Sequence, residues 1–320
     1  MSQQTSEQGL ETARQSLLYE KDVENRVATI TLNRPEKMNA PDTATRMQFA
    51  ELLHQANVDD EVKVLVIRGV GEHLGTGADL PEMLRRLQED PLFEFGIEPD
   101  SGVKYPPQDS FRSLFQVNAL YASSRGGARG LQEFKKISIV EVKGYCYGWH
   151  FYQAADADIV ISADDALFGH AAFRYLGWGP RMWTWIETMG LRQFQEMLFT
   201  GRPFTADEMR ECGFINRVVA RQDLEAEVEK YAMACAHNGS ADRIVMQKAF
   251  LEIYKQQRGE YMGSMITSVF ETLGHFARPD GADQTLGMDA MKGDLAKAVK
   301  SGEARIPPEW RLSVGGRRNG

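Results

Sequence analysis

Cysteine is scarce in this sequence, and the few cysteines present form no recognisable pair. Cys146, Cys212 and Cys235 are an odd number at wide spacings, and no CxxC motif occurs. This pattern indicates neither a disulfide framework nor a zinc site. We therefore expect no metal in the protein and a reducing, cytoplasmic environment.

Long hydrophobic runs are also missing. The first fifteen residues are polar and acidic, without the apolar centre of a signal peptide, and no later run approaches 18 uninterrupted apolar residues. The sequence predicts a protein that is neither secreted nor membrane-spanning.

An excess of positive charge is absent as well. The chain has 45 acidic and 37 basic residues and a net charge of -8. No overall basic field is available to hold a nucleic-acid backbone, so a nucleic-acid partner is not expected. Local clusters of lysine and arginine could still contact a phosphorylated ligand.

The chain does contain enough apolar material for a full core, with 42% hydrophobic residues in a length of 320. Short apolar runs at 17–19 and 27–32, separated by a polar turn, predict a β-hairpin. Asp42 or Thr43 can cap a following helix. The continuous apolar run at 64–67 is typical of a strand covered on both faces.

A second alternation of strand, helix and strand is predicted at 137–142, 149–155 and 159–161, which implies parallel packing with crossovers. Beyond residue 221 the pattern is helical, with amphipathic stretches at 224–236, 242–257, 261–276 and 283–300. The predicted division is a flexible segment at 1–16, an α/β core at 17–220 with a long insertion around 81–134, a helical region at 221–305 and a tail at 306–320. The insertion is rich in turn residues and is interpreted as an active-site cover.

Several motifs occur in a fixed order along the chain: LNRPEKMNA at 32–40, VLVIRG at 64–69, GTGADL at 75–80, VKGYCYG at 142–148 and FTGRPFTA at 199–206. Together they resemble the crotonase (enoyl-CoA hydratase/isomerase) superfamily over residues 17–300. The resemblance implies an α/β fold, a spiral of ββα turns with a C-terminal helical annex. It also implies that the annex mediates trimerisation, so a homotrimer or a dimer of trimers is expected.

The resemblance further implies an oxyanion hole formed by the backbone N–H groups of Ala78 and Trp149. A thioester or ketone oxygen that gains negative charge needs two fixed donors, preferably at a helix N-terminus. Trp149 stands where the family usually has glycine, which narrows the space but keeps the backbone donor. The alternative is that both glycine-rich turns merely allow tight packing.

Coenzyme A is expected as part of the substrate, with no tightly bound cofactor. By resemblance, the adenine would lie against the loop that ends at Ala40, and Arg34 and Lys37 would meet the phosphates. The alternative for both basic side chains is ordinary solvated surface charge.

The sequence departs from the family at the two glutamates that a hydratase needs. Aligned by motif, Tyr152 takes the first glutamate position and Ala172 the second. A hydratase uses one carboxylate to hold water and another to pass the proton. The chain is therefore interpreted as a divergent member for which simple hydration is disfavoured.

Other ionisable residues lie on the same two elements. His170 is the leading acid–base candidate, with His150 and Tyr152 as further catalytic candidates, because a histidine near neutrality can activate water. Each could instead be structural. Tyr147, Arg174 and Trp178, the last in a stretch with Trp183 and Trp185, are expected to line the substrate pocket. The tryptophan-rich stretch suggests a bulky, apolar substrate or, alternatively, core packing.

Three functions stay open from the sequence. The first is an enzyme, a lyase, hydrolase or isomerase, that stabilises an enolate or tetrahedral oxyanion of an acyl-CoA or ketone. The second is a hydrolase that cleaves a carbon–carbon bond of a cyclic β-diketone without coenzyme A. The third is a non-catalytic binding protein that keeps only the crotonase fold.

Overall fold

The computed structural model describes residues 15–82, 104, 130–175, 179, 182–273 and 302–313. Most of the predicted insertion around 81–134, the stretch at 283–300 and Trp178 lie outside these residues.

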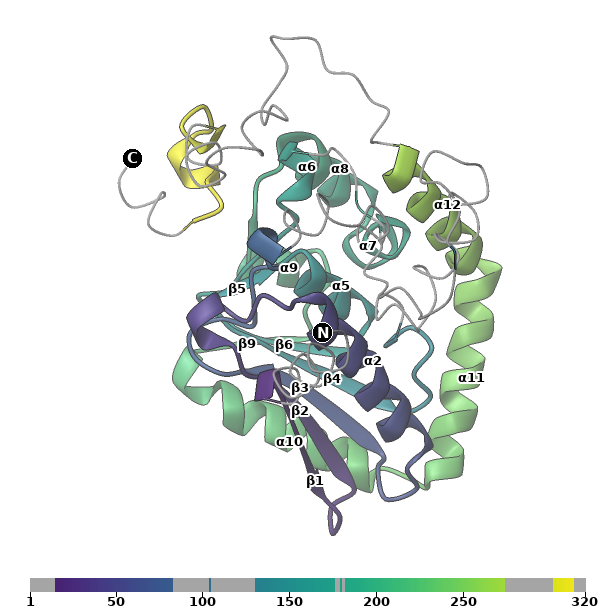
Figure 1. Cartoon of the computed structure of the whole chain (residues 1–320). Coiled ribbons are helices and arrows are strands. Elements are labelled where there is room, and N and C mark those ends of the chain that lie inside the picture. The colour runs from purple at the N-terminus through teal and green to yellow at the C-terminus, as the bar shows by residue number, and fades with distance from the viewer. Residues whose placement is uncertain are drawn as a thin grey trace.

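A six-stranded sheet forms the centre of the fold (Figure 1). Its strands, in the spatial order β1-β2-β3-β4-β6-β9, are β1 (Leu17–Asp22), β2 (Val27–Leu32), β3 (Val64–Gly69), β4 (Ile137–Val142), β6 (Ile159–Ala163) and β9 (Arg217–Val219). β1 and β2 pair antiparallel, and the remaining neighbours pair parallel. The predicted hairpin and the parallel alternation are confirmed.

Helices cover both faces of this sheet. α2 (Thr43–Val58) begins where the Asp42 side chain accepts a hydrogen bond of 2.8 Å from the Thr45 N–H, and it places Phe49 in the main core. α10 (Leu224–His237) covers the other face through residues such as Val228, which pack against Val64 and Ile139. The sequence division placed α10 in the annex, but its buried face belongs to the sheet.

A three-stranded sheet adjoins the first and consists of β5 (Tyr145–Tyr147), β7 (Leu167–Gly169) and β8 (Phe204–Thr205). Helix α5 (Trp149–Asp156) follows β5 and confirms the helix predicted there. The other helices of this region are α6 (Ala172–Tyr175), α7 (Met182–Met189), α8 (Leu191–Thr200) and α9 (Ala206–Glu211), and single 3-10 turns lie at Pro35–Lys37, Arg221–Asp223 and Pro308–Trp310.

The described part of the annex contains α11 (Ala241–Gln257) and α12 (Glu260–Leu273), and α11 runs along one side of the molecule (Figure 1). Lys248 attaches α11 to the sheet, because its buried ammonium lies 2.7 Å from both carboxylate oxygens of Asp158. Asp158 also accepts hydrogen bonds from the N–H and hydroxyl of Ser138 on β4. One carboxylate thus joins the annex to a central strand.

The two ends of the described chain are tied to the core. Asn33 donates from its backbone to the Ser16 carbonyl at 2.8 Å and from its side chain to the Gln15 carbonyl at 3.0 Å. Residues 302–313 contact the small sheet, since the Tyr147 hydroxyl donates to the Leu312 carbonyl at 2.7 Å. Residues 15–16, within the segment predicted to be flexible, and part of the predicted tail are therefore held against the core.

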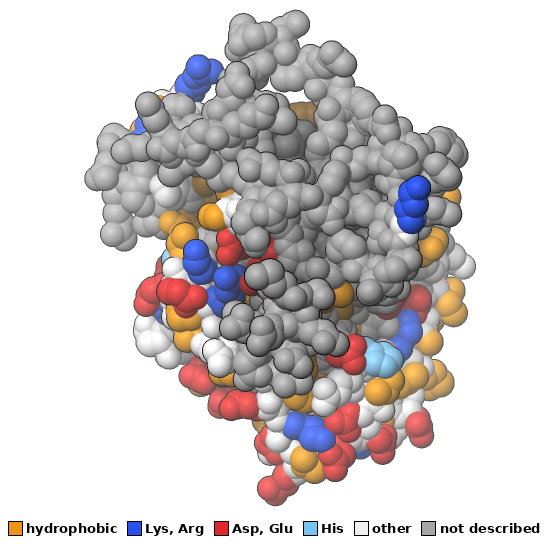
Figure 2. All heavy atoms as spheres, viewed as in Figure 1, with side chains coloured by type: hydrophobic (Ala, Val, Ile, Leu, Met, Phe, Trp, Pro, Cys, Tyr) orange, Lys and Arg blue, Asp and Glu red, His pale blue; other side chains and the backbone are white. Residues whose placement is uncertain are grey.

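Acidic and basic side chains are intermixed on the described part of the face shown in Figure 2. Elsewhere in the described part of the chain, Lys21 pairs with Asp59 at 3.0 Å and also with Glu61. Within the described residues, no helix combines the length and apolar character that a bilayer span requires.

The Lys248→Met variant tests the link between annex and sheet. Removing one partner of a buried ion pair costs about 3 kcal/mol or more, so we expect the free energy of unfolding to fall by that amount. Urea unfolding followed by circular dichroism measures it. The control is Lys230→Met, which removes an exposed lysine paired with Glu227 and is expected to change stability by about 0.5 kcal/mol or less. Equal effects of both substitutions would contradict the assignment.

Candidate active site

Two chain segments far apart in sequence meet at a short parallel bridge between Gly75 and Cys146. The Gly75 N–H donates to the Tyr145 carbonyl at 2.8 Å, and the Tyr147 N–H donates to the Gly75 carbonyl at 3.0 Å. In a parallel pairing both chains advance together, so the two turns that follow this bridge lie side by side.

Gly77 and Gly148 form these turns, and both have positive φ, +93° and +55°. Such backbone angles favour glycine. The turns also touch, because a Cβ added to Gly148 would lie 3.1 Å from the Gly77 Cα. The residues that follow the two glycines are Ala78 and Trp149, the two predicted oxyanion-hole donors.

The backbone amides around these turns are mostly occupied. Gly77, Asp79 and Gly148 donate to His150, Pro41 and Gly169 respectively. The N–H groups of Ala78 and Trp149 have no hydrogen-bond partner among the described residues. The Trp149 amide is also the first in α5, where the helix dipole favours negative charge. Chemically, two free donors on adjoining turns can receive one anionic oxygen.

His150 is fully buried behind the first turn. Its Nδ1 accepts a hydrogen bond of 3.1 Å from the Gly77 N–H, and burial lowers its pKa to about 4. A Cβ on Gly75 would lie 2.1 Å from its Nε2, so the ring packs directly against the Gly75 backbone. At neutral pH His150 is a neutral acceptor that holds the Gly77 turn.

His170 lies on the other side of the second turn. Its Nδ1 is 3.9 Å from the position that a Cβ on Gly148 would take. Aromatic rings surround it, with centroids of Tyr152, Phe173 and Trp185 at 5.6, 4.9 and 5.2 Å. His170 and Tyr152 are both nearly buried, so two of the three catalytic candidates share one apolar environment beside the Gly148 turn.

Loop 33–40 is held against the first turn by polar contacts. The Asn39 side chain accepts from the Arg34 N–H and donates to the carbonyls of Val70 and His73 at 2.9 and 2.8 Å. The Arg34 guanidinium lies 3.2 Å from Asp79 and also donates to the Ala40 carbonyl. Arg34 is thus engaged within the chain, whereas Lys37 is exposed and has no partner among the described residues.

The polar groups of two residues predicted to line the substrate pocket have partners within the chain. The Tyr147 hydroxyl donates to Leu312, as described above. The Arg174 guanidinium contacts the Glu303 carboxylate, the Trp310 carbonyl and the Gly201 carbonyl. Both groups therefore face the C-terminal segment. The third predicted residue, Trp178, lies outside the described residues.

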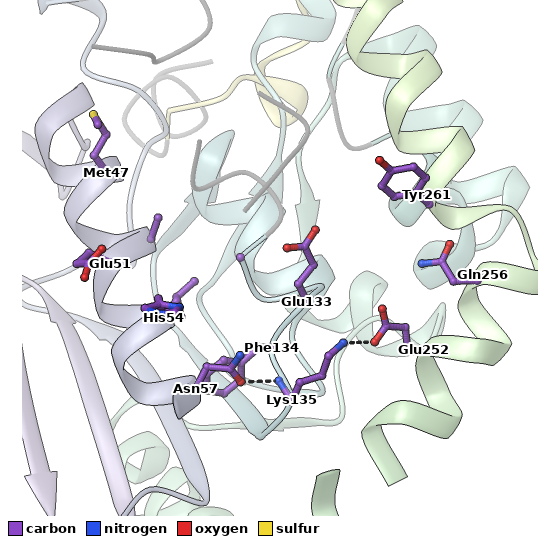
Figure 3. A pocket seen from close by; sticks show the side chains of 13 residues that line it. Met47, Glu51, His54, Asn57, Glu133, Phe134, Lys135, Glu252, Gln256 and Tyr261 are labelled. Carbon is purple, nitrogen blue, oxygen red and sulfur yellow. Dashed lines mark hydrogen bonds and ion pairs between the residues drawn. The ribbon is translucent and has the colours of Figure 1, made fainter. Parts of the chain in front are cut away.

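A cavity of about 760 Å³ lies between α2, residues 130–135, α11 and α12 (Figure 3). Lys135 pairs with Glu252 across it, and the Lys135 N–H donates to the Asn57 side chain at 2.8 Å. None of the residues singled out from the sequence lines this cavity. Its polar lining, which includes Glu51 and Glu133, differs from the aromatic surroundings of His170.

Several residues that shape the site were not predicted. Gly75 sets the register of the two turns and Asn39 fixes loop 33–40. Glu303 is 129 positions from Arg174, whose guanidinium it contacts. Gly75 belongs to the GTGADL motif and Asn39 to the LNRPEKMNA motif, but neither motif indicates which residues these two contact. Among the described residues, no cluster of three His, Cys, Asp or Glu side chains could hold a metal ion.

Comparison with known proteins identifies the family. The model of the Enoyl-CoA hydratase/isomerase family matches residues 22–100 and 118–276, more than half of the chain. The chain therefore belongs to this family, and the predicted crotonase membership is confirmed.

Individual relatives are distant. Over 203 residues the chain is 27% identical to a hydroxycinnamoyl-CoA hydratase-lyase from Pseudomonas fluorescens, covering 62% of this chain and 65% of that protein, slightly under two thirds of its length. Over 219 residues the chain is 26% identical to 4-chlorobenzoyl coenzyme A dehalogenase-2 from Arthrobacter sp, covering 66% of this chain and 69% of that protein.

Solved structures confirm the predicted fold. An enoyl-CoA hydratase/isomerase from Xanthobacter autotrophicus Py2 superposes with a TM-score of 0.74 at 22% identity, covering 91% of this chain and 98% of that one. An enoyl-CoA hydratase from Mycobacterium smegmatis superposes with a TM-score of 0.74 at 26% identity, covering 91% of this chain and 94% of that one.

His150 leads to a prediction about pH. Its pKa in the folded protein is about 4, below the ordinary value of about 6.5, so its contribution to stability is complete above pH 6.5 and is lost as pH falls towards 4. The contribution is roughly 3 kcal/mol. Burial also lowers the pKa of His73, so the pH dependence of the wild-type protein contains more than one histidine. The contribution of His150 is isolated by comparing variants with the wild-type protein.

Urea unfolding between pH 4 and 7.5 checks this prediction. We expect His150→Gln to lose much of the pH dependence, whereas His237→Gln, at an exposed position, should keep the wild-type slope. A His150→Gln variant with an unchanged slope would refute the assignment.

Proposed function

We propose that this Enoyl-CoA hydratase/isomerase-family enzyme binds an acyl-CoA thioester and stabilises its enolate or tetrahedral oxyanion with the N–H groups of Ala78 and Trp149. The observation that carries the proposal is the contact between the Gly77 and Gly148 turns, each followed by an amide that has no hydrogen-bond partner within the described part of the chain. Two preorganised donors favour the charged state over the neutral carbonyl, which lowers the barrier to reaction.

The names of relatives support coenzyme A as part of the substrate. The hydratase-lyase, the dehalogenase and a mevalonyl-coenzyme A hydratase from Aspergillus fumigatus are each named for a CoA thioester. We assign Lys37 to the phosphates, because its ammonium is exposed and unpaired among the described residues. In our proposal Arg34 shapes the loop through Asp79, and Ala40 lies beside the adenine.

We assign His170 the acid–base role. It lies beside the Gly148 turn, whereas His150 is a buried acceptor with a depressed pKa, which suits a positioning role. Tyr152 and Ala172 stand where the two glutamates are expected. No carboxylate is therefore available at these two positions to hold the attacking water and to pass the proton, as a hydratase requires. The proposed chemistry is proton transfer or water activation by one histidine rather than simple hydration.

The rings of Tyr152, Phe173 and Trp185 around His170 support an acyl group that is bulky and cyclic or aromatic. Two of the relatives are named for aromatic acyl groups, hydroxycinnamoyl and 4-chlorobenzoyl. Aromatic acyl-CoA thioesters are therefore the first substrates to test.

The test is a turnover screen of aromatic acyl-CoA thioesters, crotonyl-CoA and cyclic β-diketones, with N-acetylcysteamine thioesters as analogues without the nucleotide. We expect turnover of an aromatic acyl-CoA and a much higher KM for its analogue. Gly148→Ala, which forces the two turns apart, should lower kcat on the order of a hundredfold.

His170→Ala should lower kcat by a similar factor, and His237→Ala is the control. Cleavage of a diketone without turnover of any thioester would overturn the CoA assignment. Full activity of His170→Ala would overturn the acid–base assignment.

We also propose that the annex packs against further copies of the chain in a trimer or a dimer of trimers. Large apolar side chains on α11 and α12 are exposed in the single chain, among them Met246 (69%), Phe250 (68%) and Met262 (62%). Exposed apolar surface of this kind is typical of an interface.

Light scattering coupled to size-exclusion chromatography tests the assembly. We expect a mass of three or six chains, and Phe250→Asp should shift it towards the monomer. Val58→Asp, a control at another exposed apolar position, should leave the mass unchanged. A monomeric wild-type protein would refute the assembly.

A further inference from the structure

The segment formed by residues 302–313 contacts the core at two separate points, and we call it the C-terminal brace. The first point is the hydrogen bond of 2.7 Å from the Tyr147 hydroxyl to the Leu312 carbonyl. The second is the Arg174 guanidinium, which contacts Glu303 and the Trp310 carbonyl. Figure 1 draws this segment in yellow near the C-terminus.

Glu303 connects the two contact points. One of its carboxylate oxygens contacts Arg174, and the other accepts a hydrogen bond of 2.8 Å from the Leu312 N–H, beside the carbonyl that Tyr147 uses. The side chains of Arg174 and Glu303 are only 6% and 13% exposed. A carboxylate that is shared between a guanidinium and a backbone N–H and shielded from water holds its geometry far better than an exposed pair.

Both contact points lie next to the groups of the proposed chemistry. Tyr147 immediately precedes the turn of Gly148 that presents the Trp149 amide. Arg174 follows His170 by four residues, and two successive turns connect them, closed by hydrogen bonds from the Phe173 N–H to the His170 carbonyl at 3.1 Å and from the Arg174 N–H to the Ala171 carbonyl at 3.0 Å. Strands β5 and β7 pair Tyr147 directly with Gly169, so the brace spans the two neighbouring elements that carry the oxyanion donor and the histidine.

We propose that the C-terminal brace fixes the distance between the Gly148 turn and His170, and that Glu303, Arg174 and Tyr147 are positioning residues for the reaction. Small displacements of reacting groups cost large factors in rate, so a contact outside the site can control kcat. The inference rests on the proposed function for its effect on rate, but its structural part is independent of it.

Two variants test the brace without removing bulk. Tyr147→Phe removes only the hydroxyl, and Glu303→Gln removes only the charge. Glu309→Gln, an exposed glutamate in the same segment, is the matched control. The readouts are kcat and KM on the best thioester of the screen, and hydrogen–deuterium exchange of peptides covering residues 145–152 and 168–175.

We expect Glu303→Gln to lower kcat by about tenfold or more with KM within threefold, and to raise exchange in both peptides although neither contains residue 303. Tyr147→Phe should also lower kcat and raise hydrogen–deuterium exchange in the peptide covering residues 145–152. The control should change neither readout. A purely structural role would lower stability while kcat of the folded protein stayed at the wild-type value.

Two results overturn the brace: kcat within twofold of wild type in both variants, or increased exchange confined to residues 302–313. If the wild-type protein turns over no thioester, the proposed function fails while the exchange measurement still decides whether the brace couples the two elements.

Discussion

The two backbone hydrogen bonds between Gly75 and strand β5 are the constraint on which the rest of the site depends. They set the register in which the chain after β3 meets the chain after β4, and a slip of one residue would separate the Ala78 and Trp149 amides. Glycine is needed at Gly77 and Gly148 because the turns touch there. In the proposed function, the main role of the central sheet is to hold these two turns in contact with each other.

Burial keeps His150 neutral at physiological pH behind the Gly77 turn. Its Nδ1 accepts a hydrogen bond from the Gly77 N–H, and His170 lies among aromatic rings. Charged groups beside the site are paired: Arg34 meets Asp79, the residue after Ala78, and Arg174 meets Glu303 at the C-terminal brace. Because these charges are paired, the negative charge that develops in the proposed reaction would meet little net charge nearby, and its interaction with the two backbone N–H groups would be strong in this buried environment.

The sequence predicted the fold and its family well, because the strands at 27–32 and 64–67, the helix at 149–155 and the helix cap at Asp42 or Thr43 depend on local periodicity and caps. It also singled out Ala78 and Trp149, since their glycine turns are local motifs. It could not predict that Tyr147 and Arg174 face the C-terminal segment, because that depends on contacts with Leu312 and Glu303 across more than 100 residues. Likewise, the periodicity of residues 224–236 predicted a helix, but it could not show that this helix, α10, covers a face of the central sheet.

The central claim is that the Ala78 and Trp149 amides polarise a thioester carbonyl. The most direct test is the carbonyl stretching frequency of a ¹³C-labelled aromatic acyl-CoA bound to the protein, measured by isotope-edited infrared spectroscopy. The account predicts a shift to lower frequency on binding to the wild-type protein and a smaller shift with Gly148→Ala. A bound thioester whose carbonyl frequency equals that in water, or one shifted equally by both proteins, would contradict it.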